Sequence, residues 1–571
     1  MIKLTKVVIG LLFYIYFSGF AQNPIKTGSI PINPALKQGV LQNGLQYYIM
    51  RDTDNALNKG RIAMRLVVKA GNLHEDADQL DMGHLVEHIG MRSSENFPLG
   101  IMRYFNSLPK KVDIGASTNA TTNYYLTIPS GDEALLNKGI LAMHDCAGGM
   151  SMLPSEIEEE RSAVYREYMN ANTPAFLADV NLIYQQWDKN PVYKPRVLEV
   201  LQSVMNAPLS SMYRFYHDWY HPRYQAVIVV GDLDVVEVEH LIKKHLSSLS
   251  NEGIRPQKDV KRLYDIKLSG KDRLFISDKG KGRPGILIKV AKKSKHDVNL
   301  ECPSTINEVK TILIYDLATK MLKYRMQSNP SLKQITLQVQ TRAVANPYLS
   351  ALYAESRVNQ VSEIEPILLQ VLREMRRVSL YGFSEPEFAR ARAIINAERQ
   401  QTKVNYVTAL LNCVECGTVF SDKDLSAKIL SSISLSEINQ TIVPRISQKG
   451  NTDFVLEGSE TKSLKLPTEK EILSMLHTVS QEKLQPYIDP AIKELPAIVK
   501  GADLKDCKIT EISGSGATKV LLPNGATVIL KSLSEDQSHE QGISIRGFSK
   551  NVNEAITNDP ELALLLILCL N

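Results

Sequence analysis

The chain has 571 residues, which is too long for one hydrophobic core and suggests roughly three to four domains. Hydrophobic residues make up 43% and charged residues 23%, a composition that excludes wholesale disorder, a collagen and a coiled coil. The 67 basic residues exceed the 62 acidic ones by a net charge of only +5, and no basic block stands at either end. Nucleic acid is therefore not an expected partner.

The beginning of the chain has the pattern of an export signal. Lys3 and Lys6 precede an almost wholly apolar run over residues 7–20, and small residues stand just before Gln22, where a signal peptidase reads them. A transmembrane anchor is the alternative, but the run is shorter than the roughly 20 apolar residues that cross a bilayer. We expect a signal peptide over residues 1–21 and an exported protein, periplasmic or secreted, that leaves the membrane after cleavage.

Six cysteines are few for an exported chain of this length, so we do not expect disulfide bonds to form its framework. Cys413 and Cys416 form a single C-x-x-C motif. No second pair stands nearby to complete a zinc knuckle. A local disulfide and two buried thiols both remain open for this motif.

Alternating sheet and helix patterns run through the first 250 residues. Two stretches within residues 44–68 alternate apolar and polar side chains and predict paired strands, with a helix to follow. Residues 113–128 predict one further strand, and residues 133–146 return to helical spacing. Residues 209–249 predict a helix, a strand and another helix. The first domain should therefore close near residue 250.

The segment 251–259 contains glycine, proline and charged residues and predicts a linker. A second set of strands and long helices then continues to about residue 500. Its strongest helical patterns cover residues 311–328 and 361–381.

A short internal repeat links the two ends of the chain. The sequence VLQNGLQYYIMRD at residues 40–52 is echoed by LLPNGATVILKSL at residues 521–533, at an offset of 481. Asn-Gly hairpins are common, so chance is the alternative to duplication. The last residues are an apolar run without a helix C-cap. We expect residues 515–571 to be the truncated beginning of a third, non-catalytic repeat.

Residues 83–90, GHLVEHIG, carry His84, Glu87 and His88 in the order H-x-x-E-H. On a helix, residues four apart share a face, so both imidazoles can bind one metal ion while Glu87 projects beside them. Imidazole nitrogens suit Zn²⁺, and a carboxylate near a zinc-bound water can take its proton to produce a nucleophile for peptide hydrolysis. Solvated surface histidines are the alternative interpretation.

A catalytic zinc site also needs a third protein ligand. A helix is predicted to begin at Pro154, with a capping box formed by Ser155 and Glu158. Glu160 and Glu167 lie two turns apart on it, on a face that also has small and apolar residues, so they are best placed to turn inward. We expect the other glutamates of this helix to form a solvated acidic face: Glu156, Glu158 and Glu159.

Together these motifs resemble the signature of the pitrilysin and insulinase family of inverted-zincin metallopeptidases. That signature is H-x-x-E-H on one helix and, about 75 to 80 residues later, a glutamate on a second helix. Here His88 and Glu167 are 79 residues apart. The resemblance implies one zinc ion held by His84, His88 and Glu167, with Glu87 as the general base and Glu160 as a supporting carboxylate of the catalytic site.

The flanking sequences AGNLHEDADQLDMGHLVEH and YHDWYHPRYQAVIVVGDLD also resemble this family, and the likeness extends over about residues 37–440. It implies an α+β fold of two homologous-type domains, each with a mostly antiparallel sheet packed by helices, plus the start of a further repeat. The catalytic zinc-binding domain should span residues 30–250, and a second peptidase-family domain should span residues 251–500.

The sequence GASTNATTNYYL resembles the edge strand to which this family adds its substrate in extended form. The resemblance implies substrate contacts at Asn119 and Ala120; an ordinary edge strand with Asn119 in a turn is the alternative. Residues 91–94, MRSS, depart from the family's apolar-aromatic and glycine pattern, which bears on the shape of the pocket.

The leading hypothesis is a zinc metalloendopeptidase that hydrolyses peptide bonds through a zinc-bound water activated by Glu87. A non-catalytic or partner-dependent peptide-binding member of the same fold is the alternative. A structural zinc protein is disfavoured, because no Cys or His adjoins the motif to close the fourth position. Long family members are clamshells of two halves, which implies a second half or subunit as partner and weak cleavage without it.

Overall fold

The computed structural model describes residues 30–55, 58–118, 120–256, 258, 268–279, 285–295, 303–332, 335–340, 349–401, 404–418, 423–459, 461, 464–489, 508–512, 517–521 and 527–531. The chain divides into two compact units, Met1–Pro490 and Ala491–Asn571. The signal peptide expected at residues 1–21 and the apolar run at the end of the sequence lie outside the described residues. Among the helices that the structure does describe, none is long and apolar enough to cross a membrane.

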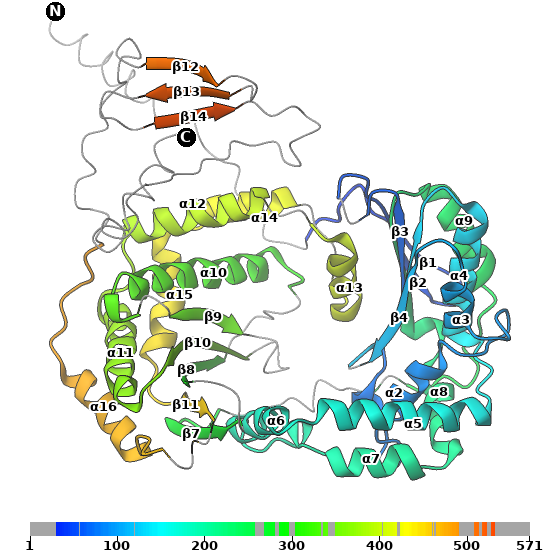
Figure 1. The fold of residues 1–571 in the computed structure, drawn as a ribbon, viewed down its shortest axis with the longest axis horizontal. Coiled ribbons are helices and arrows are strands. Elements are labelled where there is room, and N and C mark those ends of the chain that lie inside the picture. The colour runs from blue at the N-terminus through cyan, green and yellow to red at the C-terminus, as the bar shows by residue number, and fades with distance from the viewer. Residues whose placement is uncertain are drawn as a thin grey trace, which may run out of the picture. The chain divides into compact units, whose positions relative to one another are not determined.

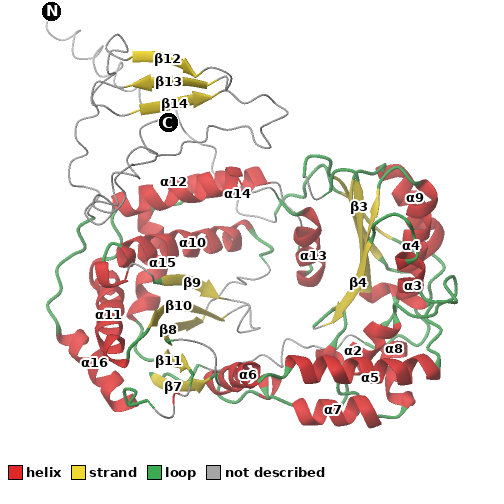
Figure 2. Cartoon of the chain, viewed as in Figure 1, coloured by secondary structure: helices red, strands yellow, loops and turns green. Residues whose placement is uncertain are grey.

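The first unit has the α+β architecture that the sequence predicts, with two sheets packed by helices (Figures 1 and 2). Its first sheet has six strands in the order β1-β2-β6-β3-β5-β4. Only β2 and β6 are parallel neighbours. The strands are β1 Lys37–Val40, β2 Gln46–Arg51, β3 Arg61–Val68, β4 Asp113–Thr118, β5 Thr122–Pro129 and β6 Gln225–Gly231.

The two stretches within residues 44–68 are strands, as predicted, but the prediction that they pair with each other is wrong. Both β2 and β3 pair with β6, which lies between them. Every residue of β6 is buried, because its nearly continuous apolar run suits a central strand. Alternation along β2 and β3 shows that each has a buried face, but it carries no information about which strand lies beside them.

Residues 113–128, predicted as one strand, form the hairpin of β4 and β5. Thr118 and Thr122 are partners at its turn, and their hydroxyl groups are 2.9 Å apart. The chain therefore reverses within the three residues between them. This hairpin leaves β4 at the edge of the sheet.

Helices pack on one face of this sheet around a core that includes Met64, Leu66, Val86 and Trp219. The helix predicted at residues 133–146 is confirmed as α4. The elements are η1 Asn72–His74, α2 Met82–Ile89, α3 Ile101–Asn106, α4 Glu133–Gly148, α5 Pro154–Ala171, α6 Pro174–Gln186, η2 Pro191–Tyr193, α7 Val197–Asn206, α8 Leu209–Trp219, η3 Pro222–Tyr224 and α9 Val235–Leu246.

Helix α5 begins at Pro154 as predicted, but the capping box of Ser155 and Glu158 is wrong. Leu153 occupies the N-cap position, and no side chain caps the helix. Proline at the first helical position lacks the N–H that a cap would satisfy, and its fixed φ favours the helix. Glu158 instead accepts a hydrogen bond from Arg161 at 3.0 Å.

The second sheet has five strands in the order β7-β11-β8-β10-β9, and only β7 and β11 are parallel neighbours. This is the arrangement of β2-β6-β3-β5-β4 in the first sheet, so the two domains share one topology. The strands are β7 Arg273–Asp278, β8 Ile286–Lys295, β9 Thr336–Gln340, β10 Leu349–Val358 and β11 Thr452–Gly458.

The helical patterns at residues 311–328 and 361–381 are confirmed as α10 and α11. The helical elements of this domain are α10 Ile306–Gln327, η5 Pro330–Leu332, η7 Val361–Glu363, α11 Ile364–Tyr381, α12 Glu385–Gln401, α13 Tyr406–Cys416, α14 Lys423–Ser432, α15 Leu435–Ser447 and α16 Glu469–Gln481.

Helix α13 packs on the first sheet, on the face opposite the helices of the first domain (Figure 1). Its buried Leu410 and Val414 contact a cluster that includes Ala226 and Ile228 of β6. The second domain thus supplies the cover for the second face of the first sheet. Cys413 of this helix is a buried, free thiol, so a local disulfide of the C-x-x-C motif does not form.

The second unit contains a three-stranded antiparallel sheet of β12 Lys508–Ile512, β13 Ala517–Leu521 and β14 Thr527–Lys531. In its hairpin Leu521 pairs with Thr527, as Val40 pairs with Gln46 in the hairpin of β1 and β2. Both pairs are related by the offset of 481 seen in the sequence. The two segments therefore share the register of their strand pairing as well as their sequence similarity.

Candidate metal centre

The H-x-x-E-H residues lie on α2, which packs between the sheet, α5 and α8. Leu85, Val86 and Ile89 are fully buried and fix one face of this helix against the core. The opposite face presents His84 and His88, whose ring centroids are 5.0 Å apart. The apolar residues of the motif thus decide which way the two imidazoles point.

Glu167 reaches both imidazoles from α5. Its Oε2 lies 3.5 Å from Nε2 of His84 and 3.4 Å from Nε2 of His88. A tetrahedral zinc ion with bonds of about 2.0–2.1 Å places its donors about 3.4 Å apart. The three side chains therefore offer a donor set and a spacing that fit Zn²⁺. The side chain of Glu167 is 58% exposed, so this group is open to solvent on the side of α5.

Glu87 lies beside the metal-binding group but outside it, with its Oε2 3.7 Å from Nε2 of His84. Burial raises the pKa of this carboxyl, although the two histidines oppose the shift. A carboxyl group with a raised pKa at the wall of a cleft is suited to take up and release a proton.

Carboxylates also shift the pKa of the two imidazoles. Burial opposes a positive charge on His84, but the carboxylates of Asp81, Glu87 and Glu167 outweigh it and raise the pKa. For His88, burial is likewise outweighed, chiefly by the hydrogen bond to Glu160, and the pKa is raised.

Glu160 is not one of the three candidate ligands; it contacts the ring nitrogen of His88 that faces away from Glu167. Its Oε2 lies 2.7 Å from Nδ1 of His88, and its Oε1 accepts a hydrogen bond of 2.5 Å from Nε of Arg92. The bonds to His88 and Arg92 lower the pKa of Glu160. An ionised carboxylate on Nδ1 directs the Nε2 lone pair of His88 toward a metal.

Arg92 was absent from the residues that the sequence indicated, and Glu156 was misjudged. The prediction that Glu156 is simply solvated is wrong: it is half-buried, and its Oε1 accepts a hydrogen bond of 2.5 Å from Ser93 Oγ. Glu159 pairs with Arg92 at 3.0 Å. Part of the acidic face of α5 therefore serves to hold residues 91–94. The sequence shows a cation and two hydroxyl groups in this segment, but their closeness to the acidic helix is visible only in the structure.

A cleft of about 1080 Å³ opens beside this group, and its lining includes both histidines, Glu87, Glu160 and Glu167. The edge strand β4 forms another part of its wall with residues 114–118, so an extended chain in the cleft would run along an open strand edge. Ala120 is exposed in the turn after this strand and is not part of the lining. Asn119 lies outside the described residues.

A second group of potential ligands consists of Glu95, His144 and Asp145. Asp145 is fully buried, and its two oxygens already accept hydrogen bonds from Ser94 and Asn96 and contact Nδ1 of His144. This carboxylate anchors the loop after α2. Its donors saturate it, so the first group remains the better metal site.

Comparison with known families gives two adjoining matches. Residues 53–209 match the model of the insulinase family, peptidase family M16, and residues 206–395 match that of the peptidase M16 inactive domain. The "Probable zinc protease PqqL" of Haemophilus influenzae is 28% identical over 328 residues, 55% of this chain and 34% of that protein. The "Zinc protease PQQL-like" of Arabidopsis thaliana is 25% identical over 90% of this chain and 52% of that protein.

Solved structures show the same fold. The crystal structure of the periplasmic protease PqqL from Escherichia coli has a TM-score of 0.70 at 19% identity, covering 89% of this chain and 57% of that one. The structure of the first half of that protease has a TM-score of 0.69 at 18% identity, covering 81% of this chain and 100% of that one. The present chain spans only about a third to a little over half of the relatives' length. On these matches and this fold, the chain belongs to the pitrilysin and insulinase family of peptidases, M16.

Proposed function

We propose that the chain is a zinc-dependent metallopeptidase that hydrolyses peptide bonds in peptides, with one zinc ion held by His84, His88 and Glu167. The observation that carries the proposal is the convergence of Nε2, Nε2 and Oε2 at distances of 3.4 and 3.5 Å. Curated relatives named as zinc proteases support the choice of metal and of reaction.

A bound zinc ion would supply a Lewis acid that polarises the peptide carbonyl and lowers the pKa of a water molecule. Glu87 takes the proton from that water as it attacks and delivers a proton to the departing amide nitrogen. Glu160 keeps Nδ1 of His88 engaged, so that Nε2 stays turned toward the metal. Each of these roles uses a side chain whose position follows from the packing of α2 on α5.

The peptide would bind as an added strand along β4. Residues 114–118 lie on the cleft, and the backbone of an edge strand can pair with an extended chain. The family resemblance extends this proposal to contacts from Asn119 and Ala120, although Ala120 lies beside the cleft lining and not within it. Because backbone hydrogen bonds tolerate many sequences, this mode favours broad peptide selection.

We also propose that the protein acts outside the cytoplasm after loss of residues 1–21. The support is the signal pattern in the sequence, together with the E. coli relative, which is described as a periplasmic protease.

The test is incubation of the purified chain with a mixed peptide library, with and without a chelator, followed by mass spectrometry of the products. Cleavage that disappears with the chelator and returns with added Zn²⁺ is the expected result. Cleavage that persists unchanged in chelator would overturn the metal assignment. Stoichiometric zinc without any cleavage, even with a partner half supplied, would favour the non-catalytic alternative.

A further inference from the structure

Asp81 occupies the N-cap position of α2 but does not cap it. An N-cap aspartate ordinarily accepts a hydrogen bond from a backbone N–H in the first turn. Here the carboxylate turns away: Oδ2 lies 3.2 Å from Nδ1 of His84, and Oδ1 accepts a hydrogen bond of 2.8 Å from the hydroxyl of Tyr168. The helix start therefore needs another partner, and the Asp81 side chain is committed to a ligand histidine.

Glu75 provides that other partner. Its Oε2 accepts the N–H of Asp81 at 2.9 Å, and its Oε1 accepts the N–H of Gly83 at 3.0 Å. The backbone at Asp81 is left-handed, with φ of 68°, a conformation that aspartate tolerates better than most residues. This turn aims the Asp81 side chain back toward His84 while the Glu75 carboxylate satisfies the helix start.

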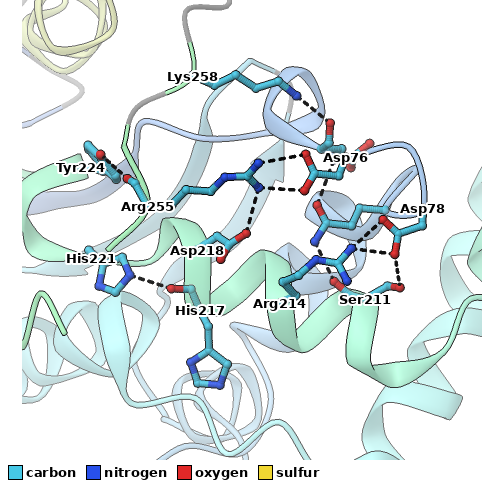
Figure 3. A network of polar contacts seen from close by, with 12 residues as sticks. Asp76, Asp78, Ser211, Arg214, His217, Asp218, His221, Tyr224, Arg255 and Lys258 are labelled. Carbon is cyan, nitrogen blue, oxygen red and sulfur yellow. Dashed lines mark hydrogen bonds and ion pairs between the residues drawn. The ribbon is translucent and has the colours of Figure 1, made fainter. Parts of the chain in front are cut away.

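The loop that carries Glu75 is fixed by the segment that follows the first domain (Figure 3). Lys258 Nζ donates to the carbonyl oxygen of Glu75 at 2.8 Å. Arg255 donates to Asp76 at 2.7 Å and to Asp218 of α8 at 3.1 Å. These contacts anchor the backbone of the loop that presents the Glu75 carboxylate to the helix start, so Asp81 is not needed as the cap.

Asp81 and Glu160 make equivalent contacts with the two histidines. Each carboxylate lies on Nδ1 of one imidazole, Asp81 on His84 and Glu160 on His88. The Nε2 atoms of both rings therefore face Glu167. Each carboxylate is also bonded to a second residue, and for Asp81 this is Tyr168, which follows Glu167 directly on α5.

We propose that Asp81, held by Tyr168, is a positioning residue of the metal centre. It fixes the tautomer and the ring orientation of His84, and its bond to Tyr168 fixes the turn of α5 that presents Glu167. The inference rests on the proposed zinc site and extends it to residues that do not touch the metal. Partners of this kind typically contribute 10–100-fold in metal affinity.

The test is the zinc dissociation constant of the apoprotein, measured by competition with a chromogenic chelator, with thermal unfolding of each apoprotein alongside. Asp81→Gly removes the carboxylate, and glycine accepts a positive φ without strain. Asp81→Asn keeps an oxygen that accepts from Nδ1–H. Tyr168→Phe removes one hydroxyl group, and Tyr165→Phe on an exposed position of the same helix is the matched control.

We expect Asp81→Gly to weaken zinc binding about 10–100-fold, with Asp81→Asn restoring part of that loss. Tyr168→Phe should weaken it less, Tyr165→Phe should not change it, and Tyr168→Phe should add nothing to Asp81→Gly because it acts through Asp81. Wild-type affinity in both Asp81→Gly and Tyr168→Phe would overturn this inference alone. A wild-type protein that binds no zinc would overturn the proposed function as well.

Discussion

In the proposed mechanism Glu87 moves a proton and does not bind the metal, since it lies beside the three candidate ligands and is not one of them. Glu87→Gln should keep zinc and peptide affinity while turnover falls by about 10²-fold or more, since glutamine cannot accept the proton. Zinc content and peptide kinetics on the same preparation measure both properties. Loss of zinc in this variant would contradict the role given to Glu87.

Arg92 reaches the metal centre only through Glu160, so its removal should have a smaller effect. We expect Arg92→Met to weaken zinc binding by about three- to tenfold, below the usual cost of losing a direct partner of a ligand. Glu159→Gln breaks only the exposed pair with Arg92 and is the control. Equal effects of the two variants would show that Arg92 acts merely as a surface charge.

His74 gives the fold a predictable response to acid. Burial, assisted by the charge of Lys258, lowers its pKa from 6.5 to about 4. Between pH 6.5 and 4 the unfolded chain therefore binds a proton at His74 that the folded chain does not bind. The contribution of neutral His74 to the free energy of unfolding is present in full above pH 6.5 and is lost as the pH falls toward 4. His74→Phe should reduce the fall in unfolding free energy over that range by about 3 kcal/mol.

Urea unfolding at several pH values measures this change. His217→Phe, at an exposed position, is the control and should leave the pH dependence near that of the wild type. An unaltered acid response in His74→Phe would show that other groups dominate it.

At this scale, helical spacing and residue type indicate His84, Glu87 and His88. They leave both Glu160 and Glu167 as candidates for the third ligand, and the family resemblance selects Glu167. Asp81 could not be found in this way. Its part depends on a left-handed backbone and on a tyrosine 87 residues away, and neither leaves a local pattern. Arg92 likewise pairs with a carboxylate 68 residues away.

At the scale of elements, helix α13 shows where local patterns stop being informative. The alternation of β2, β3 and β6 predicts strands, but the partners of these strands and the helix that covers their second face come from distant parts of the chain. The hairpin at residues 113–128 was missed for a related reason, since the three residues between β4 and β5 did not interrupt the alternation. The uncapped start of α5 likewise depends on Pro154 rather than on a capping pair.

Leu410 tests the contact of α13 with the first sheet. It is fully buried among residues of β6, so Leu410→Ala should lower the free energy of unfolding by about 2–5 kcal/mol through lost burial and a cavity. Leu198→Ala on α7, where the leucine is 75% exposed, should change it by less than about 0.5 kcal/mol. Similar small losses in urea unfolding for both variants would argue against a tight contact.

At the scale of the whole molecule, the chain covers about a third to a little over half of its curated relatives, and it matches the first half of the E. coli protease along that half's whole length. We propose that a second peptidase-family half or subunit completes the walls of the cleft. Peptide cleavage per chain should therefore be weak in dilute solution and rise when such a partner associates, because substrate contacts would then be complete.

The measurement is specific activity over a concentration series, with sedimentation on the same samples. Among the described residues of the second unit, the pairing of β13 with β14 has the same register as that of β1 with β2, at the offset of the sequence repeat. Constant, high specific activity in a demonstrated monomer would contradict partner dependence.

The central claim is that Glu167, together with the two histidines of α2, holds one catalytic zinc ion. The most direct test is the zinc content per chain of purified wild-type protein and Glu167→Gln, determined by atomic absorption after removal of loosely bound metal. We predict one zinc ion per wild-type chain and a large loss in the variant, because one of only three protein ligands is removed. Full zinc occupancy in Glu167→Gln would contradict the account.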